Sequence, residues 1–281
     1  GMAALGKLSA LEELSMGATL ITDAGFTRLS ELRRLRRLRV WGRLLSEKAL
    51  IGLTGLDHLQ ELVVFFDLGN RGLAALKKWG QLRRLHVRVR SGVSLAALGS
   101  MHRLGELVVR GEVAGEKPRT FGSLPVLPAL HTLRLTGDIA RASLSAIARQ
   151  RSLVWLDLTV SRVVDGSLQL LAPLPRLTRL RADGGALPKR SGLGALPRLR
   201  WLRLNTSAEP WKPGQKRRPF GVEKLIELRY LSIGFCKRSL RGLEKLKNLE
   251  TLDLYPAHDV DRLELLAGLK ELKKLRSMEL Q

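Results

Sequence analysis

The chain has 281 residues, a length at which a single globular core stops growing efficiently and chains usually divide into domains. Only 5% of the residues are aromatic, and 49 Lys and Arg against 26 Asp and Glu give a formal net charge of +23. Such a charge favours solubility and acidic partners, although 34 Arg beside 15 Lys is also what codon usage in a G+C-rich genome produces. We expect no membrane-spanning helix, because no apolar run is long enough.

Cysteine content bears on where the protein works. The chain has one cysteine, Cys236, so it can form no disulfide within itself, and residues 1–7 contain no apolar leader sequence. We therefore expect a cytoplasmic protein.

A single pattern, Leu-x-x-Leu-x-apolar, recurs along the chain and predicts one short β-strand in each copy. The twelve copies begin at Leu11, Leu35, Leu59, Leu82, Leu104, Leu130, Leu153, Leu177, Leu199, Leu228, Leu249 and Leu275. The eleven steps between the first and the last average 24 residues. With the first leucine as position 0, position +3 is Leu in eleven copies and Met278 in the twelfth, and position +5 is always apolar. Apolar positions two residues apart indicate a strand with one buried face.

Apolar residues three apart precede each strand and predict a short helix. Position −6 is apolar in all twelve copies, position −3 in all except the copy with Gln150, and position −9 in nine of the eleven that contain it. Residues suited to cap the helix N-terminus lie just before this part: Asp23, Ser46, Asn70, Ser143 and Asp165. Each copy is therefore predicted to be one strand followed through a loop by one short helix.

The repeat resembles the leucine-rich-repeat family over residues 5–281, and the segment Thr19–Phe26 is similar to the T-x-I-T-D-x-G-L phrase of the cysteine-containing and related bacterial repeats. The resemblance implies one α/β solenoid domain over residues 1–281, a curved horseshoe of about twelve repeats with parallel strands on the concave face and helices on the convex face. One departure lies at position +8, where the family usually places Asn or Cys. Here this position holds residues of many kinds, including Arg43, Asp67 and Cys236, so the solenoid should depend mainly on leucine burial.

Positions +2, +4 and +6 of each copy should face solvent on the concave side, because side chains alternate along a strand. These 36 positions hold six of the thirteen aromatic residues, whereas an even spread over the chain would place about two there. The six are Trp41, Phe65, Trp155, Trp201, Tyr230 and Tyr255. The same positions hold no lysine and nine arginines: Arg37, Arg39, Arg84, Arg88, Arg110, Arg134, Arg179, Arg181 and Arg203.

Aromatic residues and arginine without lysine are typical of protein interfaces. We expect these side chains to bind a protein or peptide partner with acidic segments; the alternative is that large side chains on a curved sheet only cover one another. Seven acidic residues share the 36 positions, so nine cations against seven anions leave a net charge of +2 there. A mixed surface suits a protein better than a nucleic-acid backbone.

A long step between the repeats at Leu199 and Leu228 predicts a projecting loop over residues 208–220. This secondary basic loop contains Trp211, Lys212, Lys216, Arg217 and Arg218, and it either clamps an acidic segment or a phosphate or is a solvated insertion. The basic segment 32–39 keeps its leucines in the repeat phase, so its cations are interpreted as residues that point outward between core columns.

Signals of catalysis are absent from the pattern. The five histidines are dispersed over different repeat positions, no glycine-rich phosphate loop is present, and Cys236 lies in a column that the family fills for structure. We therefore expect no catalytic residue, no metal and no cofactor.

Three functions compete at this point. The first is a non-catalytic protein-interaction module, the second is a basic protein that binds nucleic acid or an acidic membrane, and the third is the substrate-docking part of an enzyme. The aromatic and arginine enrichment favours the first, and the charge of +23 favours the second.

Overall fold

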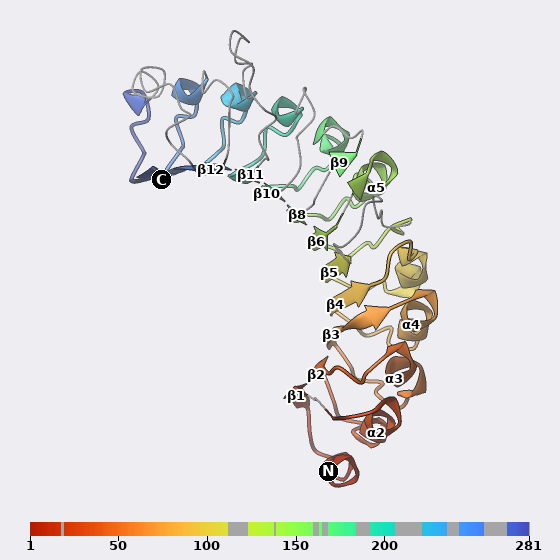
Figure 1. Ribbon diagram of the computed structural model, residues 1–281. Coiled ribbons are helices and arrows are strands. Elements are labelled where there is room, and N and C mark those ends of the chain that lie inside the picture. Colours follow the sequence, from red (N-terminus) through yellow and green to blue (C-terminus); the bar gives the residue numbers. More distant parts are fainter. Residues whose placement is uncertain are drawn as a thin grey trace. The chain divides into compact units, whose positions relative to one another are not determined.

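The computed structural model describes residues 1–17, 20–111, 123–137, 139–159, 163–164, 168–183, 192–205, 221–234, 242–255 and 269–280, without the side chains of 139–141, 163–164 and 280 (Figure 1). The chain forms two compact units, Gly1–Gly137 and Asp138–Gln281. Each of the twelve predicted repeats contributes one strand to the described part, which confirms the repeat phase. The single domain over residues 1–281 stays a prediction.

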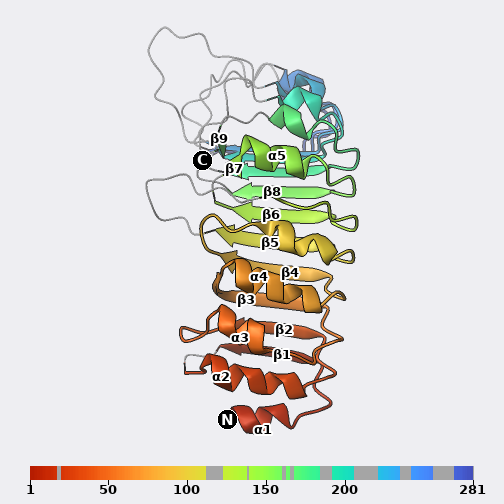
Figure 2. The same ribbon diagram turned by 90° about the vertical axis from the view of Figure 1, so that its right-hand side faces the viewer.

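Unit 1 contains six parallel strands that pair in sequence order, each with the strand of the next repeat. The strands are β1 (Glu13–Gly17), β2 (Arg37–Trp41), β3 (Glu61–Leu68), β4 (Arg84–Val89), β5 (Glu106–Gly111) and β6 (Thr132–Thr136). The helices are α1 (Met2–Gly6), α2 (Asp23–Phe26), η1 (Thr27–Glu31), α3 (Glu47–Gly52), α4 (Asn70–Ala75), η2 (Leu76–Lys78) and η3 (Leu95–Ser100), where η denotes a 3₁₀ helix. Helices α2, α3 and α4 are stacked along the unit (Figure 2).

Unit 2 repeats the same plan with shorter helices. Its main strands pair in the order β8 (Trp155–Thr159), β10 (Arg179–Asp183), β11 (Trp201–Asn205), β12 (Tyr230–Gly234), β13 (Thr251–Tyr255) and β14 (Ser277–Leu280). Its helices are α5 (Arg141–Ile147), η4 (Leu168–Leu171), η5 (Leu193–Ala195), η6 (Val222–Lys224) and η7 (Leu243–Lys245). Strands β7 (Ile139–Ala140) and β9 (Val163–Val164) form a separate parallel pair.

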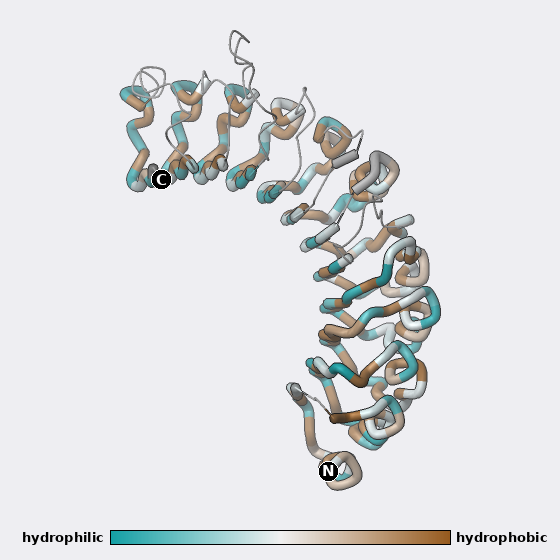
Figure 3. Tube along the Cα trace, viewed as in Figure 1, coloured by the Kyte–Doolittle hydropathy of each residue, from teal (hydrophilic) through white to brown (hydrophobic). Residues whose placement is uncertain are grey.

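In each unit the strands lie on one side of the ribbon and the helices on the other, and consecutive helices lie farther apart than consecutive strands (Figure 1). This spacing follows from the closer approach that hydrogen-bonded strands allow, about 4.8 Å against about 8–10 Å for helices. Each coil alternates hydrophobic and hydrophilic residues along the chain (Figure 3). The core between the layers is formed by the predicted leucine columns, and Leu38, Leu85, Leu156 and Leu202 are completely buried.

The predicted helix caps are correct at one position and wrong at three. Ser46 caps α3 by accepting a hydrogen bond from the Lys48 N–H at 3.2 Å. Asp23 and Asn70 instead begin their helices, and each accepts a hydrogen bond from the backbone N–H of the next repeat, at Ser46 and Ser94. Ser143 lies inside α5, and Asp165 lies outside the described residues. These carboxylate and amide groups therefore connect neighbouring repeats where the family's Asn or Cys column is degenerate.

Candidate functional site

The open face is defined here as the side of each sheet that is directed away from the helices, and it corresponds to the predicted concave face. All thirteen residues proposed for partner binding lie on strands, and none of them is buried. They are Trp41, Phe65, Arg84, Arg88, Arg110, Arg134, Trp155, Arg179, Arg181, Trp201, Arg203, Tyr230 and Tyr255. Six of the thirteen lie in unit 1 and seven in unit 2, and the structure groups several of them by contact.

The aromatic corner of unit 1 consists of Trp41 and Phe65, whose side chains are 48% and 42% exposed. Their rings meet edge to face with centroids 6.4 Å apart, and the Arg110 guanidinium lies 5.7 Å from the Phe65 centroid. The indole of Trp41 also covers Gly17 of the preceding strand, where any Cβ atom would collide with it. Glycine at this position and the edge-to-face contact therefore hold two exposed aromatic rings in place before any partner arrives.

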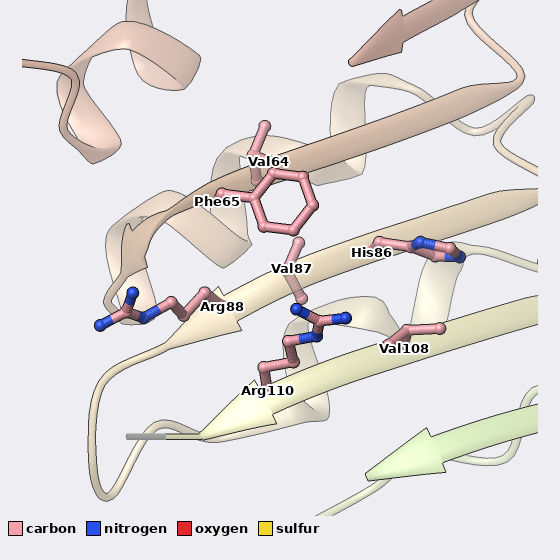
Figure 4. Close-up of a pocket in the computed structure, with 7 residues that line it drawn as sticks. All are labelled: Val64, Phe65, His86, Val87, Arg88, Val108 and Arg110. Atoms are coloured by element: carbon pink, nitrogen blue, oxygen red, sulfur yellow. The ribbon is translucent and has the colours of Figure 1, made fainter. Parts of the chain in front are cut away.

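A shallow hollow with a volume of about 20 Å³, open to solvent, adjoins this corner; it is called the unit 1 hollow. It is lined by Val64, Phe65, His86, Val87, Arg88, Val108 and Arg110 (Figure 4). The Phe65 ring and the Arg110 guanidinium, from β3 and β5, approach each other across β4. Strand β3 carries a register irregularity between Val63 and Asp67 in its pairing with β4, at the level of Phe65. Apolar side chains beside guanidinium groups suit an apolar partner residue next to a carboxylate.

Charge pairs also lie on the open face of unit 1. Glu61 is only 5% exposed, and its carboxylate accepts from Arg39 Nε at 2.7 Å and from Arg84 Nη1 at 3.4 Å. His86 Nε2 lies 3.1 Å from Glu106 Oε1. Arg88 Nε lies 2.8 Å from Asp67 Oδ1. Several of the predicted binding arginines are thus already engaged within the protein.

The aromatic pair of unit 2 is formed by Trp201 and Tyr230, which occupy the same register position on β11 and β12. Their rings stack with centroids 5.0 Å apart and an angle of 6° between the planes. The Tyr230 hydroxyl donates to Asp253 Oδ2 at 2.7 Å. Burial and this bond to a carboxylate raise the pKa of Tyr230, since both disfavour the phenolate. The neighbouring Tyr255 bonds Glu279 at 3.0 Å, which raises its pKa to about 12.

Acidic residues of the open face are less exposed than the sequence indicated. Strand alternation predicted Asp157, Asp183, Asp253 and Glu61 at the solvent face, but the first three are 7% exposed and Glu61 is 5% exposed. Longer arginine side chains lie beside them. Arg181, on the same strand as Asp183, donates from Nε to Asp183 Oδ2 at 2.5 Å, and Arg203 Nε of the next strand lies 3.7 Å from the same oxygen. The solvent therefore meets arginine and aromatic side chains above a layer of buried carboxylates.

Two groups of predicted residues lie outside the described part of the chain. The secondary basic loop with Trp211, Lys212, Lys216, Arg217 and Arg218 is one of them, and Cys236 is the other. In the described part, no group of three or more His, Cys, Asp and Glu is arranged to hold a metal ion. No described helix is long and apolar enough to cross a membrane.

Comparison with known proteins identifies the architecture. The sequence matches no protein-family model and no curated protein. An internalin, inlF of Listeria monocytogenes, superposes on all of this chain and 87% of its own with a TM-score of 0.61 and 16% identity. The chain has the leucine-rich-repeat fold. The functional domain of InlJ from L. monocytogenes, which includes a cysteine ladder, covers all of this leucine-rich-repeat chain and 51% of its own length, with a TM-score of 0.53 and 15% identity. With one cysteine in its sequence, this chain has no equivalent of that ladder.

A second charged surface of this leucine-rich-repeat chain lies outside the positions that strand alternation assigns to the open face. Arginine and lysine recur just before each strand of unit 2, at positions −2, −1 and +1 of the repeat. These positions are not among +2, +4 and +6, for which the charges of the open face were counted. Counting charge column by column would have found them, since the repeat phase assigns every residue to a column.

Proposed function

We propose that this chain is a non-catalytic protein-interaction module whose partner, a protein or peptide, lies on the open face. The observation that carries the proposal is the pair of preformed aromatic clusters, Trp41–Phe65 and Trp201–Tyr230, on that face. Rigid aromatic groups lose little conformational entropy when a partner covers them, which is why they dominate binding energies. The lone Cys236 supports work in the cytoplasm, because it permits no disulfide within the chain.

The charge of the open face of unit 1 favours a partner with an acidic segment. Six arginines against three glutamates at positions +2, +4 and +6 leave a net charge of +3 there, and the unit 1 hollow places Arg88 and Arg110 beside apolar side chains. An apolar residue flanked by Asp or Glu complements this arrangement.

The open face of unit 2 supports a different contact. Three arginines against four acidic residues leave a net charge of −1, so this face does not favour the alternative of a polyanion. Its aromatic residues Trp155, Trp201, Tyr230 and Tyr255 are half-buried, and an uncharged or mixed partner surface suits them.

The test compares partner capture by two triple variants. Trp155→Ala, Trp201→Ala and Tyr230→Ala together should abolish capture of the natural partner from host extract, while circular dichroism shows that the repeats are still folded despite the loss of the Tyr230–Asp253 hydrogen bond. The matched control is Leu44→Ala, Ile51→Ala and Ile226→Ala, which also removes three exposed apolar side chains but none from the open face. Capture that survives the first variant, or that both variants weaken equally, contradicts the proposal.

A further inference from the structure

The basic rim of unit 2 is the strip of residues at positions −2, −1 and +1 of its six main strands. It holds nine cations: Arg151, Arg176, Arg198, Arg200, Arg229, Lys247, Lys273, Lys274 and Arg276. Only Glu227 and Glu250 oppose them, so nine cations against two anions give a net charge of +7 over 18 positions. The open face of the same unit has a net charge of −1, so the positive charge is concentrated on the rim.

The rim is exposed, and its backbone is hydrogen-bonded from repeat to repeat. All nine cations are exposed. Two consecutive amides of each repeat donate to one carbonyl of the repeat before; Arg229 N and Tyr230 N, for example, both donate to Arg200 O at 2.9 and 3.1 Å. The same arrangement joins Arg200 N and Trp201 N to Thr178 O. The cations of successive repeats therefore lie on neighbouring hydrogen-bonded strands, which are about 4.8 Å apart.

These cations remain available to an anion. Arg200 pairs with Glu227 at 3.1 Å and Arg229 pairs with Glu250 at 3.2 Å, but both pairs are solvent-exposed. Exposed pairs of this kind contribute little to stability, so a phosphate can replace the carboxylate. Arg151 and Arg198 each donate to a proline carbonyl, Lys247 pairs with Glu271 and Lys274 bonds Asn248, all at exposed positions. In the described part of the chain, the side chains of Arg176 and Arg276 make no hydrogen bond or ion pair.

An aromatic row lies directly beside the rim, at position +2. Trp155, Arg179, Trp201 and Tyr230 occupy this position in four consecutive strands and are paired in register. Thr251 follows Tyr230 in the same row, so the ring face of Tyr230 that is directed away from Trp201 has only a small side chain beside it. A cationic strip next to stacking groups is the arrangement that proteins use for single-stranded nucleic acid.

We propose that the basic rim of unit 2 binds the phosphodiester backbone of single-stranded nucleic acid, with bases stacking on the adjacent Trp201–Tyr230 pair. Planar guanidinium groups match phosphate oxygens, and six of the nine rim cations are arginine. A duplex keeps its bases in the stack and so cannot use the aromatic row. An acidic membrane would require a broad apolar face beside the cations, whereas the exposed large apolar side chains on the rim are Val154 and Ile226.

The experiment measures, by fluorescence anisotropy, binding of the full chain to a labelled oligothymidylate of about 16 nucleotides. This length is the upper end of the site sizes of compact single-strand-binding folds. The wild type should bind with an affinity that falls steeply with salt. Arg198→Glu, Arg200→Glu and Arg229→Glu together should weaken binding at least about 10-fold and lower the slope of log K against log salt by about 2, since each single-strand phosphate contact contributes about 0.7. The control, Lys224→Glu, Lys245→Glu and Lys270→Glu, makes the same change of charge on exposed residues in or beside the helical segments and should bind almost as wild type.

The outcomes separate the rim from general attraction. If both triple variants lose affinity equally, binding follows net charge and the rim has no special role. Equal or tighter binding of a duplex, of vesicles rich in phosphatidylserine or of a poly-glutamate peptide also overturns the proposal.

If circular dichroism shows that the glutamate variant does not fold, the triple variant Arg198→Gln, Arg200→Gln and Arg229→Gln replaces it and should still weaken binding. Trp201→Ala should reduce affinity with little change in the salt slope, because stacking releases no counterions. This assay contains no protein partner, so its failure is distinguished from a failure of partner capture, although both proposals use the Trp201–Tyr230 pair.

Discussion

Tyr230 and Asp253, 23 residues apart on adjacent strands, are joined by a hydrogen bond of 2.7 Å from the phenol to a carboxylate that is 7% exposed. Tyr230→Phe removes the donor and leaves a nearly buried charge with one bond fewer. We expect the free energy of unfolding in urea to fall by about 1–3 kcal/mol. Tyr255→Phe is the matched control: its bond to Glu279 is exposed, so the substitution should change stability far less than Tyr230→Phe. Equal effects would show that burial of Asp253 is unimportant.

The same two tyrosines make the ionisation of the native protein measurable, since the chain contains no others. Burial and the bond to Asp253 raise the pKa of Tyr230, and the bond to Glu279 raises that of Tyr255 to about 12. A tyrosine whose pKa is raised by folding stabilises the protein below the ordinary pKa of about 10, and this contribution is lost as the pH rises through the native pKa. Tyrosinate absorbance should therefore appear at higher pH in the native protein than in denaturant. Coincident titrations would contradict both hydrogen bonds.

Glu47 connects three repeats of unit 1. Its Oε2 atom accepts from Gly69 N at 2.8 Å and Gly72 N at 3.0 Å, and its Oε1 atom lies 2.7 Å from Arg90 Nη2. Burial alone would raise the pKa of Glu47, but these bonds to the carboxylate outweigh burial and lower it from 4.5. Its contribution to stability is therefore present above the ordinary pKa and is lost as the pH falls through the native value.

Glu47→Gln should consequently destabilise the protein by about 1–3 kcal/mol at neutral pH, because hydrogen bonds to a charged group are lost. The difference from wild type should shrink as the pH falls below 4.5. Glu12→Gln is the control, since both members of the Glu12–Arg36 pair are more than half exposed, and it should have little effect at any pH. Urea unfolding between about pH 3 and 7 measures both, and a difference that stays constant with pH would contradict the assigned role.

The fold follows from the sequence because one rule is repeated twelve times. Each copy from Leu35 to Leu249 buries the leucine at position +3, and the strand register places these leucines opposite one another, as Leu202 is opposite Leu231. Errors in a single copy do not change the phase. Helix caps were less predictable. Asp23 and Asn70 accept hydrogen bonds from backbone N–H groups of the next repeat instead of from their own helix, and the local sequence does not show which N–H group a side chain reaches.

The candidate site was only partly predictable for a related reason. Alternation along each strand correctly placed Trp41, Phe65, Trp201 and Tyr230 on the open face. It does not show how far a side chain is covered by its neighbours. The burial of Asp183 depends on Arg181 of its own strand and on Arg203 of the next, and the second of these follows only from the strand register. The stack of Trp201 on Tyr230 depends on the same cross-strand register.

Leu156 and Val154 test whether leucine burial carries the stability of the repeat. Leu156 is completely buried on β8, whereas Val154, two residues earlier, is 37% exposed. Leu156→Ala should lower the free energy of unfolding by about 2–5 kcal/mol, because it removes apolar contacts and leaves a cavity that stacked repeats cannot close. Val154→Ala should cost less than about 0.5 kcal/mol, as expected for an exposed position. Because each repeat contacts only its neighbours, a loss at Leu156 should also broaden the unfolding transition. Similar small effects for both variants, measured by urea titration, would mean that the leucine columns do not hold the solenoid together.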